Sequence, residues 1–199
     1  MSLPVGQQPA EQIAPAAFRA AAAELLAVVG SAPERVGVTL TEVPAPKRMA
    51  PYAVALSAEV CRGDEEVATG RFVVLHDPAG QEGWGGTTRI VAFVQSEVDA
   101  EMAADPSLGQ AGWSWLTDAL AGLPHTAAGG TVTRTVSARF GDIVQTEEAS
   151  EVEIRASWTP LEAPSGELDL VSHLRAWCAL LCSTAGLPPP GVAALPLRR

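Results

Sequence analysis

The chain has 199 residues, enough for one domain with a full core, and its 47% hydrophobic and 18% charged content is typical of a packed globular protein. The net charge is −10, and the chain has no basic run longer than a pair, such as the terminal Arg198 and Arg199. Because contacts to phosphates need a cationic footprint, direct binding to nucleic acid is disfavoured.

The N-terminus has neither the basic nor the apolar region of a signal peptide. The longest apolar stretch, residues 14–30, is interrupted by Arg19 and Glu24 and is too short and too amphipathic to cross a bilayer. We therefore expect a cytoplasmic protein without a membrane span. Cys178 and Cys182 lie four residues apart on an expected helix, without a further ligand at metal-binding spacing. We interpret them as buried apolar residues, and we expect no metal and no cofactor.

The first third of the chain predicts a helix followed by a strand. Residues 1–12 are polar and contain proline and glutamine, and we expect them to be flexible. A helix is expected from Pro15 to Gly30, with an apolar stripe formed by Phe18, Ala22, Leu25 and Val29. Residues 35–43 alternate as in a strand, and the proline-rich segment 44–51 predicts a connection.

Three longer strands are expected next. Residues 52–61 place their apolar side chains on one parity, which predicts a strand with one buried face. In the following two strands, residues 67–76 and 87–98, apolar side chains occur on both parities. We expect these two to be central strands that are partly covered on both faces.

Two tryptophans, Trp113 and Trp115, follow a short acidic helix that is expected at residues 100–104. Trp113 begins an apolar stripe with helical spacing, which continues through Leu116, Leu120 and Leu123. Two residues correspond to about 200° of helical rotation, so both indoles cannot face the same core. Either the helix starts after Trp113, or one indole faces another element, a ligand or another protein. We expect Trp113 to lie in the core and Trp115 to be partly accessible.

The last third predicts two strands, residues 131–140 and 151–158, each with one apolar and one polar parity, which indicates antiparallel pairing. A final helix is expected over residues 166–185. The order α-β-β-β-β-α-α-β-β-α predicts an α+β fold: an about six-stranded, mainly antiparallel sheet with helices packed on one face. We expect a single domain over residues 13–187 and a Pro-rich tail over residues 188–199.

The loop between the two central strands combines polar residues with glycines. His76 and Asp77 stand beside glycines that allow close backbone approach to a ligand, which is compatible with acid/base chemistry. The glycine spacing matches neither a phosphate-binding loop nor a dinucleotide turn. The alternative, which we favour, is a long hairpin loop. In it, Asp77 starts the turn, Gly80 takes a positive φ and Trp84 folds back as a hydrophobic plug.

Two arginines, Arg71 and Arg134, lie on strand parities that are otherwise apolar. A buried arginine needs a carboxylate or carbonyl partner, and such sites sometimes recognise anions. The commoner alternative is an arginine near a strand end or edge whose guanidinium reaches solvent. Ser114 lacks the second glycine of a nucleophile elbow, and His125 has no visible partner. We therefore assign no catalytic residue.

Five runs of sequence are distinctive: residues 50–60, 70–81, 101–106, 112–120 and 153–160. Together they resemble one uncharacterised actinobacterial family, a domain of unknown function, over about residues 18–197. Several long motifs match in the same order, which makes the resemblance specific. It implies no activity. Genes of that family tend to lie near one for a ribonuclease D-like enzyme, which suggests RNA metabolism by association and gives no residue a role.

Two functions are compatible with these observations. The first is a non-enzymatic cytoplasmic binding or adaptor protein whose partner is a protein, a second copy of the chain included. Its order of elements is similar to that of small secretion-chaperone-like proteins, which dimerise and hold partner segments. The alternative is a small enzyme or ligand-binding domain that uses the 76–89 loop. The side chains expected to bind a partner or ligand are Trp115, Trp84, Arg71, Arg89, His76 and Asp77.

Overall fold

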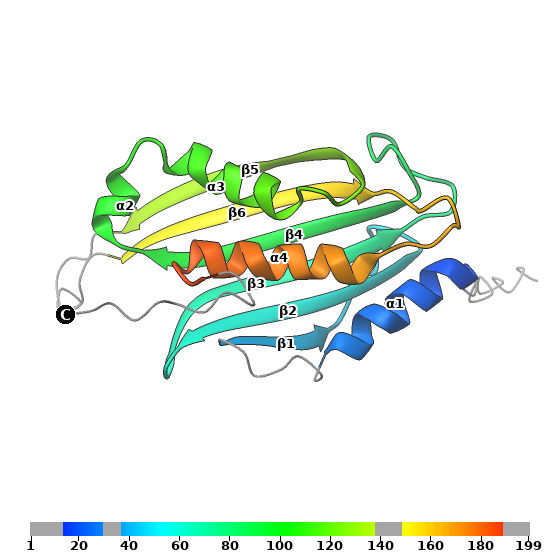
Figure 1. The fold of residues 1–199 in the computed structure, drawn as a ribbon, viewed down its shortest axis with the longest axis horizontal. Helices are drawn as coiled ribbons and strands as arrows, with labels where there is room; N and C mark the ends of the chain where they lie inside the picture. The colour runs from blue at the N-terminus through cyan, green and yellow to red at the C-terminus, as the bar shows by residue number, and fades with distance from the viewer. Residues whose placement is uncertain (1–13, 30–36, 138–148, 189–199) are drawn as a thin grey trace, which may run out of the picture.

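The computed structural model describes residues 14–29, 37–137 and 149–188, which form one six-stranded antiparallel sheet (Figure 1). The strand order is β1-β2-β3-β4-β6-β5, so the last two strands are exchanged relative to the chain. The strands are β1 Val38–Val43, β2 Tyr52–Arg62, β3 Glu65–His76, β4 Thr88–Val98, β5 His125–Ser137 and β6 Ala149–Pro160. The helices are α1 Ala16–Val28, α2 Ala100–Ala104, α3 Leu108–Ala119 and α4 Leu170–Thr184.

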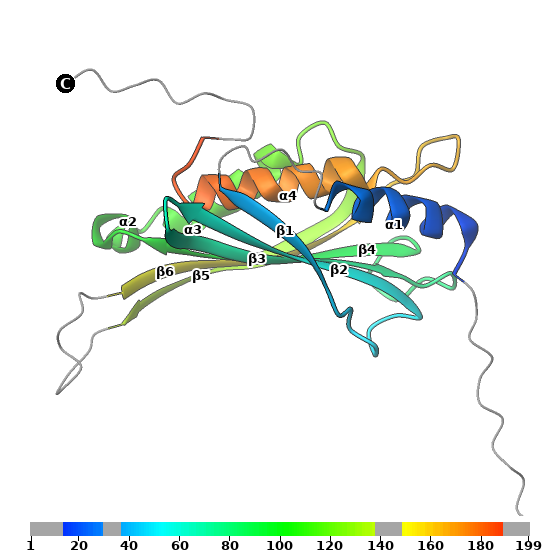
Figure 2. The same ribbon diagram turned by 90° about the horizontal axis from the view of Figure 1, so that it is seen from below.

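All four helices lie on one face of the sheet (Figure 2). The central helix α4 contacts α3 on one side and α1 on the other, and it covers the middle strands β3 and β4. This arrangement confirms the expected α+β fold, with its order of elements and its helices packed on one face. No helix in the described ranges is long and apolar enough to cross a membrane.

The main core lies between α4 and the sheet and is built around Phe72, Trp158 and Trp177, all fully buried. Gly70 of β3 lets the Trp177 indole approach the backbone, since a Cβ at position 70 would lie 2.6 Å from Trp177 Cζ2. Trp177 Nε1 donates to the carbonyl of Phe93 on β4, over 3.3 Å. One indole therefore fixes α4 to the two central strands.

The tryptophan helix α3 begins at Leu108, so the suggestion that it starts after Trp113 is wrong. Its buried positions are Leu108, Gly112 and Leu116, and the two indoles flank this stripe on opposite sides. Trp113 and Trp115 are both half-buried, and both pack against the main core. The expectation that the two indoles could not face the same core is also wrong. An indole is large enough to reach the core from a position on either side of the buried stripe. Trp115 is partly accessible as expected, but Trp113 is not fully buried.

Strand β5 begins at His125, six residues earlier than expected, and the expected residues 138–140 lie outside the described chain. Arg134 of β5 is exposed on an edge strand, as the commoner alternative predicted, and it makes no ion pair among the described residues. Its Nη1 donates to the carbonyls of Ala103, at 3.2 Å, and Asp105, at 2.7 Å, at the end of α2. A cation at a helix C-terminus is electrostatically favourable, so Arg134 has a structural role.

The two cysteines of α4 are structural, as expected. Cys182 is buried and Cys178 is half-buried against the core. Burial raises the pKa of the Cys178 thiol to about 12 and also raises the pKa of Cys182. Both therefore stay protonated at neutral pH, and neither is activated as a nucleophile.

His173, in the first turn of α4, accepts a buried hydrogen bond. Its Nδ1 lies 3.1 Å from Nε1 of Trp158, which donates, and the residue is only 3% exposed. Burial, and to a smaller extent nearby His125, lower the pKa of His173 to about 4, while Asp169 opposes the shift. The ring is therefore neutral, with its proton on Nε2, and protonation at Nδ1 would break the bond to Trp158.

Acid should therefore destabilise the fold through His173. The imidazole takes up a proton near pH 6.5 in the unfolded chain but near pH 4 in the folded one, so its stabilisation is complete above 6.5 and is lost as the pH falls toward 4. At about 1.4 kcal/mol per pKa unit, the loss is roughly 3 kcal/mol. Urea titrations followed by circular dichroism between pH 7 and pH 4 would measure it.

The matched variant is His173→Gln, whose amide oxygen can accept from Trp158 without titrating. The pH dependence should shrink in this variant without vanishing, since burial also lowers the pKa of His76. An unchanged pH dependence in His173→Gln would show that His173 is not the titrating group.

Candidate functional site: the open face of the sheet

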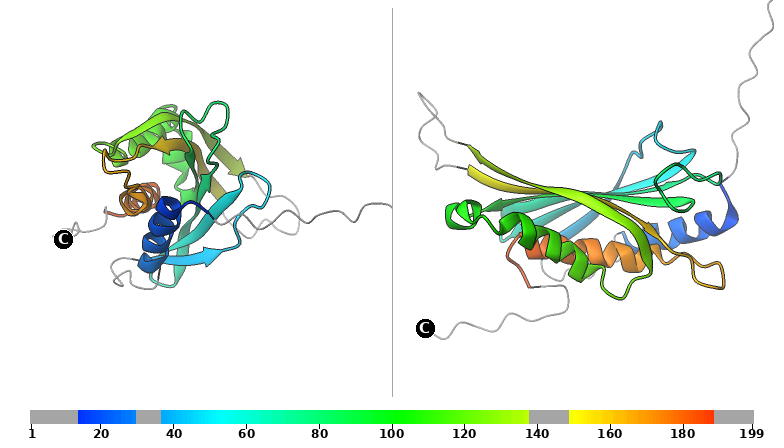
Figure 3. Two further views of the ribbon diagram at one scale, coloured as in Figure 1. Left: turned by 90° about the vertical axis from the view of Figure 1, so that its right-hand side faces the viewer. Right: turned by 90° about the horizontal axis from the view of Figure 1, so that it is seen from above.

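The face of the sheet opposite the helices carries no helix in the described part of the chain (Figure 2). We call it the open face. Two loops meet at one end of it: residues 44–51 between β1 and β2, and residues 77–87 between β3 and β4. Figure 3 (right) shows the first loop projecting away from the helices. Gln81 Nε2 donates to the carbonyl of Met49 over 3.0 Å and so ties the two loops together.

A second, small apolar cluster lies on the open face beside these loops. Its buried members are Ala55, Val73 and Leu75, and half-buried Trp84 and Val91 pack against them. The cluster explains why β3 and β4 are apolar on both parities, as expected for central strands covered on both faces in part. The side chains of one parity are covered by the helices. Those of the other parity are covered only at the end of the sheet where the two loops meet.

The 77–87 loop folds as the favoured hairpin alternative predicted. Asp77 Oδ1 accepts from the amide of Ala79 over 3.0 Å, and the Gly80 amide donates to the carbonyl of Asp77 over 2.8 Å. Gly80 has a φ of +70°, which glycine adopts without strain. The carbonyl of Trp84 accepts a short hydrogen bond from the Thr159 hydroxyl on β6. The indole is thus held as a plug over the apolar cluster.

A hollow of about 380 Å³ opens between the two loops and the sheet. Its walls combine apolar side chains with one cation, one carboxylate and two neutral polar groups: Met49, Leu75, Trp84, Val91, Arg89, Glu82, Gln81 and Ser157. Met49 is 49% exposed, so the apolar cluster is not sealed on this side. The hollow has room for an apolar side chain of a ligand or a partner.

Arg89 of β4 borders the hollow and has only neutral partners among the described residues. Its Nη1 donates to the carbonyl of Ala127 (2.9 Å) and to the Thr159 hydroxyl (3.2 Å), and its Nη2 donates to the Ser157 hydroxyl (2.7 Å). Burial lowers the pKa of Arg89, but a guanidinium stays protonated in proteins. Among the described residues, this partly desolvated positive charge has no carboxylate within ion-pair distance.

Further along the open face, Arg71, Phe93 and Arg155 stand in one row across β3, β4 and β6. The Arg155 guanidinium carbon lies 5.6 Å from the centre of the Phe93 ring, and Arg155 also pairs with Glu153 at 2.9 Å. In the part of the chain that the structure describes, Arg71 has neither a hydrogen bond nor an ion pair. Of these two arginines, Arg71 is the one available to a negatively charged partner.

The far end of the open face is acidic. Glu59, Glu97, Glu151 and Glu153 lie on it, and Gln95 donates to Glu151 over 2.9 Å. Along the strands the face therefore changes from apolar at the loop end, through cationic and aromatic in the middle, to acidic. Such a gradient gives a bound segment a defined direction.

Three of the six predicted binding residues, Trp84, Arg89 and Arg71, lie on the open face, and Asp77 lies in the loop at its end. Sequence reasoning assigned no role to Met49, Phe93 or Arg155. One pattern in the sequence could have indicated this surface. Strand β4 has apolar side chains on both parities, and the second parity, which includes Phe93, indicates a second face that is covered in part.

The other two predicted residues, His76 and Trp115, lie on the helix side. The His76 ring stacks on Phe18 of α1 at 4.8 Å between centroids, and its Nδ1 lies 2.9 Å from the Thr88 hydroxyl. Burial lowers the pKa of His76, so its ring is neutral at pH 7. His76 is buried on the helix side, while the Asp77 carboxylate is used within its own loop, so the two form no acid/base pair.

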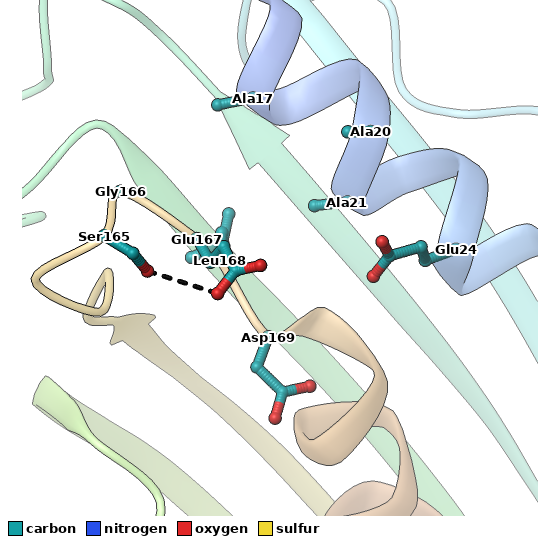
Figure 4. A pocket seen from close by; sticks show the side chains of 9 residues that line it. All are labelled: Ala17, Ala20, Ala21, Glu24, Ser165, Gly166, Glu167, Leu168 and Asp169. Atoms are coloured by element: carbon teal, nitrogen blue, oxygen red, sulfur yellow. Dashed lines mark hydrogen bonds between the residues drawn. The ribbon is translucent and has the colours of Figure 1, made fainter.

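A second hollow of about 480 Å³ lies between α1 and the loop before α4, with Glu24, Glu167 and Asp169 around it (Figure 4). Two of these carboxylates already have structural partners. Asp169 caps α4 by accepting from the amide of Ser172 at 2.9 Å, and Glu167 accepts from Ser165 at 3.1 Å. Hydrogen bonding from the Ser172 side chain, and to a smaller extent from its amide, lowers the pKa of Asp169. No group of three His, Cys, Asp or Glu side chains in the described ranges is arranged to hold a metal ion.

The two apolar clusters should contribute very differently to stability. Trp158→Ala empties the main core and should lower the free energy of unfolding by about 3–5 kcal/mol. Trp84→Ala removes only the half-buried indole on the open face. It should lower the free energy of unfolding by about 1–2 kcal/mol, because one side of this cluster is already exposed to solvent. Urea unfolding followed by circular dichroism would measure both. A Trp84→Ala cost equal to that of Trp158→Ala would contradict the two-cluster description.

Comparison with known proteins adds the family and nothing on activity. No curated protein and no solved structure matches the chain significantly. A family model described as a protein of unknown function, DUF3000, matches residues 14–193, which include all ten described helices and strands. The match confirms the resemblance to a domain of unknown function. The chain belongs to the DUF3000 family.

Proposed function

We propose that this protein is a non-enzymatic adaptor whose open face binds an extended segment of a partner protein, with both apolar and acidic side chains. The observation that carries the proposal is the pair Arg71 and Arg89. These two cations lack carboxylate partners among the described residues and border an uncovered apolar surface, in a chain whose net charge is −10.

The apolar part of such a segment has a defined place. The hollow beside Trp84 has a floor formed by Leu75 and Val91 and an exposed methionine, Met49, at its side. Methionine adapts its shape to different partners. Burying one Leu-sized side chain there contributes about 1.5–3 kcal/mol.

The acidic side chains of the proposed segment would bind at Arg71 and Arg89. Arg71 stands opposite Phe93, four residues from Arg89 along the sheet, which corresponds to about 13 Å at 3.3 Å per residue. An extended segment lying along the strands therefore reaches both arginines with carboxylates about four residues apart. A guanidinium binds a carboxylate through two parallel hydrogen bonds, which fixes orientation as well as affinity.

The charges on the face favour a protein over a nucleic acid. A phosphate backbone that followed the strands would run from Arg71 onto the glutamates at the far end, where like charges repel. A peptide can place basic residues there and carboxylates at Arg71 and Arg89. Each zone of the face then meets a group of opposite charge or an apolar one.

The adaptor role is also favoured over catalysis by the groups around the hollow. Its hydroxyl, Ser157, accepts a hydrogen bond from Arg89, and no described histidine lines the hollow. A volume of about 380 Å³ does suit a small ligand, so an apolar carboxylate compound held by Arg89 is the alternative function. A cytoplasmic location fits the three unpaired cysteines.

A photo-crosslinker at Phe93 tests the adaptor role. In source cells, p-benzoylphenylalanine at position 93 should give a discrete protein adduct on irradiation, while the same group at Gln110, exposed on α3, should not give that adduct. Arg71→Glu should abolish the adduct, whereas Arg175→Glu on α4 should not. Because Arg71 is exposed and makes no bond in the described chain, Arg71→Glu should change the free energy of unfolding by about 0.5 kcal/mol or less.

Identical adducts at positions 93 and 110, or an adduct that survives Arg71→Glu, would overturn the proposal. If no protein adduct forms and a small molecule instead co-purifies with the wild type but not with Arg89→Gln, the alternative ligand-binding function is supported.

A further inference from the structure

Strand β5 forms one edge of the sheet, and no described strand pairs with its outer side (Figure 1). After a register shift between Thr126 and Gly129, it pairs with β6 without interruption from Gly129 to Ser137. Within these nine residues, every second one therefore directs its backbone N–H and C=O outward, which makes a regular outer row. The opposite edge strand, β1, has only six residues.

This edge lacks the devices that normally prevent strands from adding to a sheet. Such devices are prolines, lysines, bulges and inward-pointing charges. Residues 129–137 contain no proline and no lysine, and their pairing with β6 shows no bulge. Arg134, their one charged residue, is turned back onto the carbonyls at the end of α2. Val136 is an apolar side chain that is 59% exposed.

We infer that β5 pairs antiparallel with β5 of a second copy of this chain, around a two-fold axis at Thr133. Thr133 is the midpoint of residues 129–137, so this register uses all nine residues on both copies. Antiparallel pairing about one residue is isologous, as closed dimers require. The dimer is independent of the function proposed for the open face.

Side-chain chemistry fits this register on both faces. On the open face, Thr133 meets Thr133 and Thr131 meets Thr135, and such threonine pairs are favourable across antiparallel strands. On the helix face, exposed Val136 lies opposite Gly130, which has no side chain to collide with it. A register centred one residue later would place Arg134 opposite Arg134, with like charges in direct opposition.

The dimer would join two six-stranded sheets into one continuous twelve-stranded sheet. Because the two-fold axis is perpendicular to the sheet at Thr133, both helix layers lie on the same side. The two open faces then form a single surface with two copies of each arginine. A partner with two binding segments would gain avidity from this arrangement.

Sedimentation of the full chain tests the dimer. The wild type should sediment at about 41 kDa, twice the 20.6 kDa of one chain. Thr133→Lys places two like charges at the axis and should give a 20.6 kDa monomer that still folds, since the lysine lies opposite Glu153 of its own β6. The matched control is Thr39→Lys on the edge strand β1, where the lysine lies opposite Glu59 and should leave the dimer intact.

A cysteine variant tests the register and does not depend on the behaviour of Thr133→Lys. Thr133→Cys should form an intermolecular disulfide under mild oxidation, because directly opposed residues have Cα atoms about 4.5–5.5 Å apart. Thr131→Cys, which faces Thr135 of the other copy, should crosslink much more slowly, and the wild type should not crosslink. A monomeric wild type, a dimeric Thr133→Lys, or crosslinking that is faster at position 131 than at 133 would each overturn the inference.

Discussion

The packing of the four described helices on one face of a six-stranded sheet is the constraint on which the rest of this structure depends. The covered face is closed by the indole of Trp177, which enters the space left by Gly70 and bonds to the backbone of β4. The other face has no such cover in the described chain, except the two loops that meet at Met49 and Gln81. The small apolar cluster, the hollow and the unpaired arginines are consequences of this one-sided packing.

The open face and the β5 edge differ in the kind of partner that they select. In the proposed function, the open face offers side chains, and its order of apolar, cationic and acidic zones would select a segment by charge and shape. The β5 edge offers backbone groups, so it selects any strand of sufficient length unless side chains discriminate. In the inferred dimer, the threonine pairs of β5 and the position of Val136 opposite Gly130 would make a second copy of the same strand the best matched partner.

Sequence patterns predicted every helix and strand of the described fold, and most of these elements have a clear apolar stripe or parity. The prediction was wrong at two places: where large tryptophan side chains lie beside the buried stripe of a helix, and where glycines interrupt the strand pattern. Trp113 and Trp115 flank the buried stripe of α3, a position that only a large side chain can use. The start of β5 was missed because Gly129 and Gly130 have low strand propensity, which pairing with β6 overrides. Of the residues predicted to bind, Arg71, Arg89 and Trp84 lie on the open face and His76 lies on the helix face. The sequence could not separate them, because it does not show which parity the helices cover.

The central claim is that the open face is bare in the isolated protein and covered in the cell, and hydroxyl-radical footprinting tests it most directly. Met49 on the open face and Met102 on α2 are 49% and 36% exposed, so both should be oxidised readily in the purified protein. In intact cells, the oxidation of Met49 should fall several-fold while that of Met102 stays unchanged. Equal oxidation of Met49 inside and outside the cell, relative to Met102, would contradict the account.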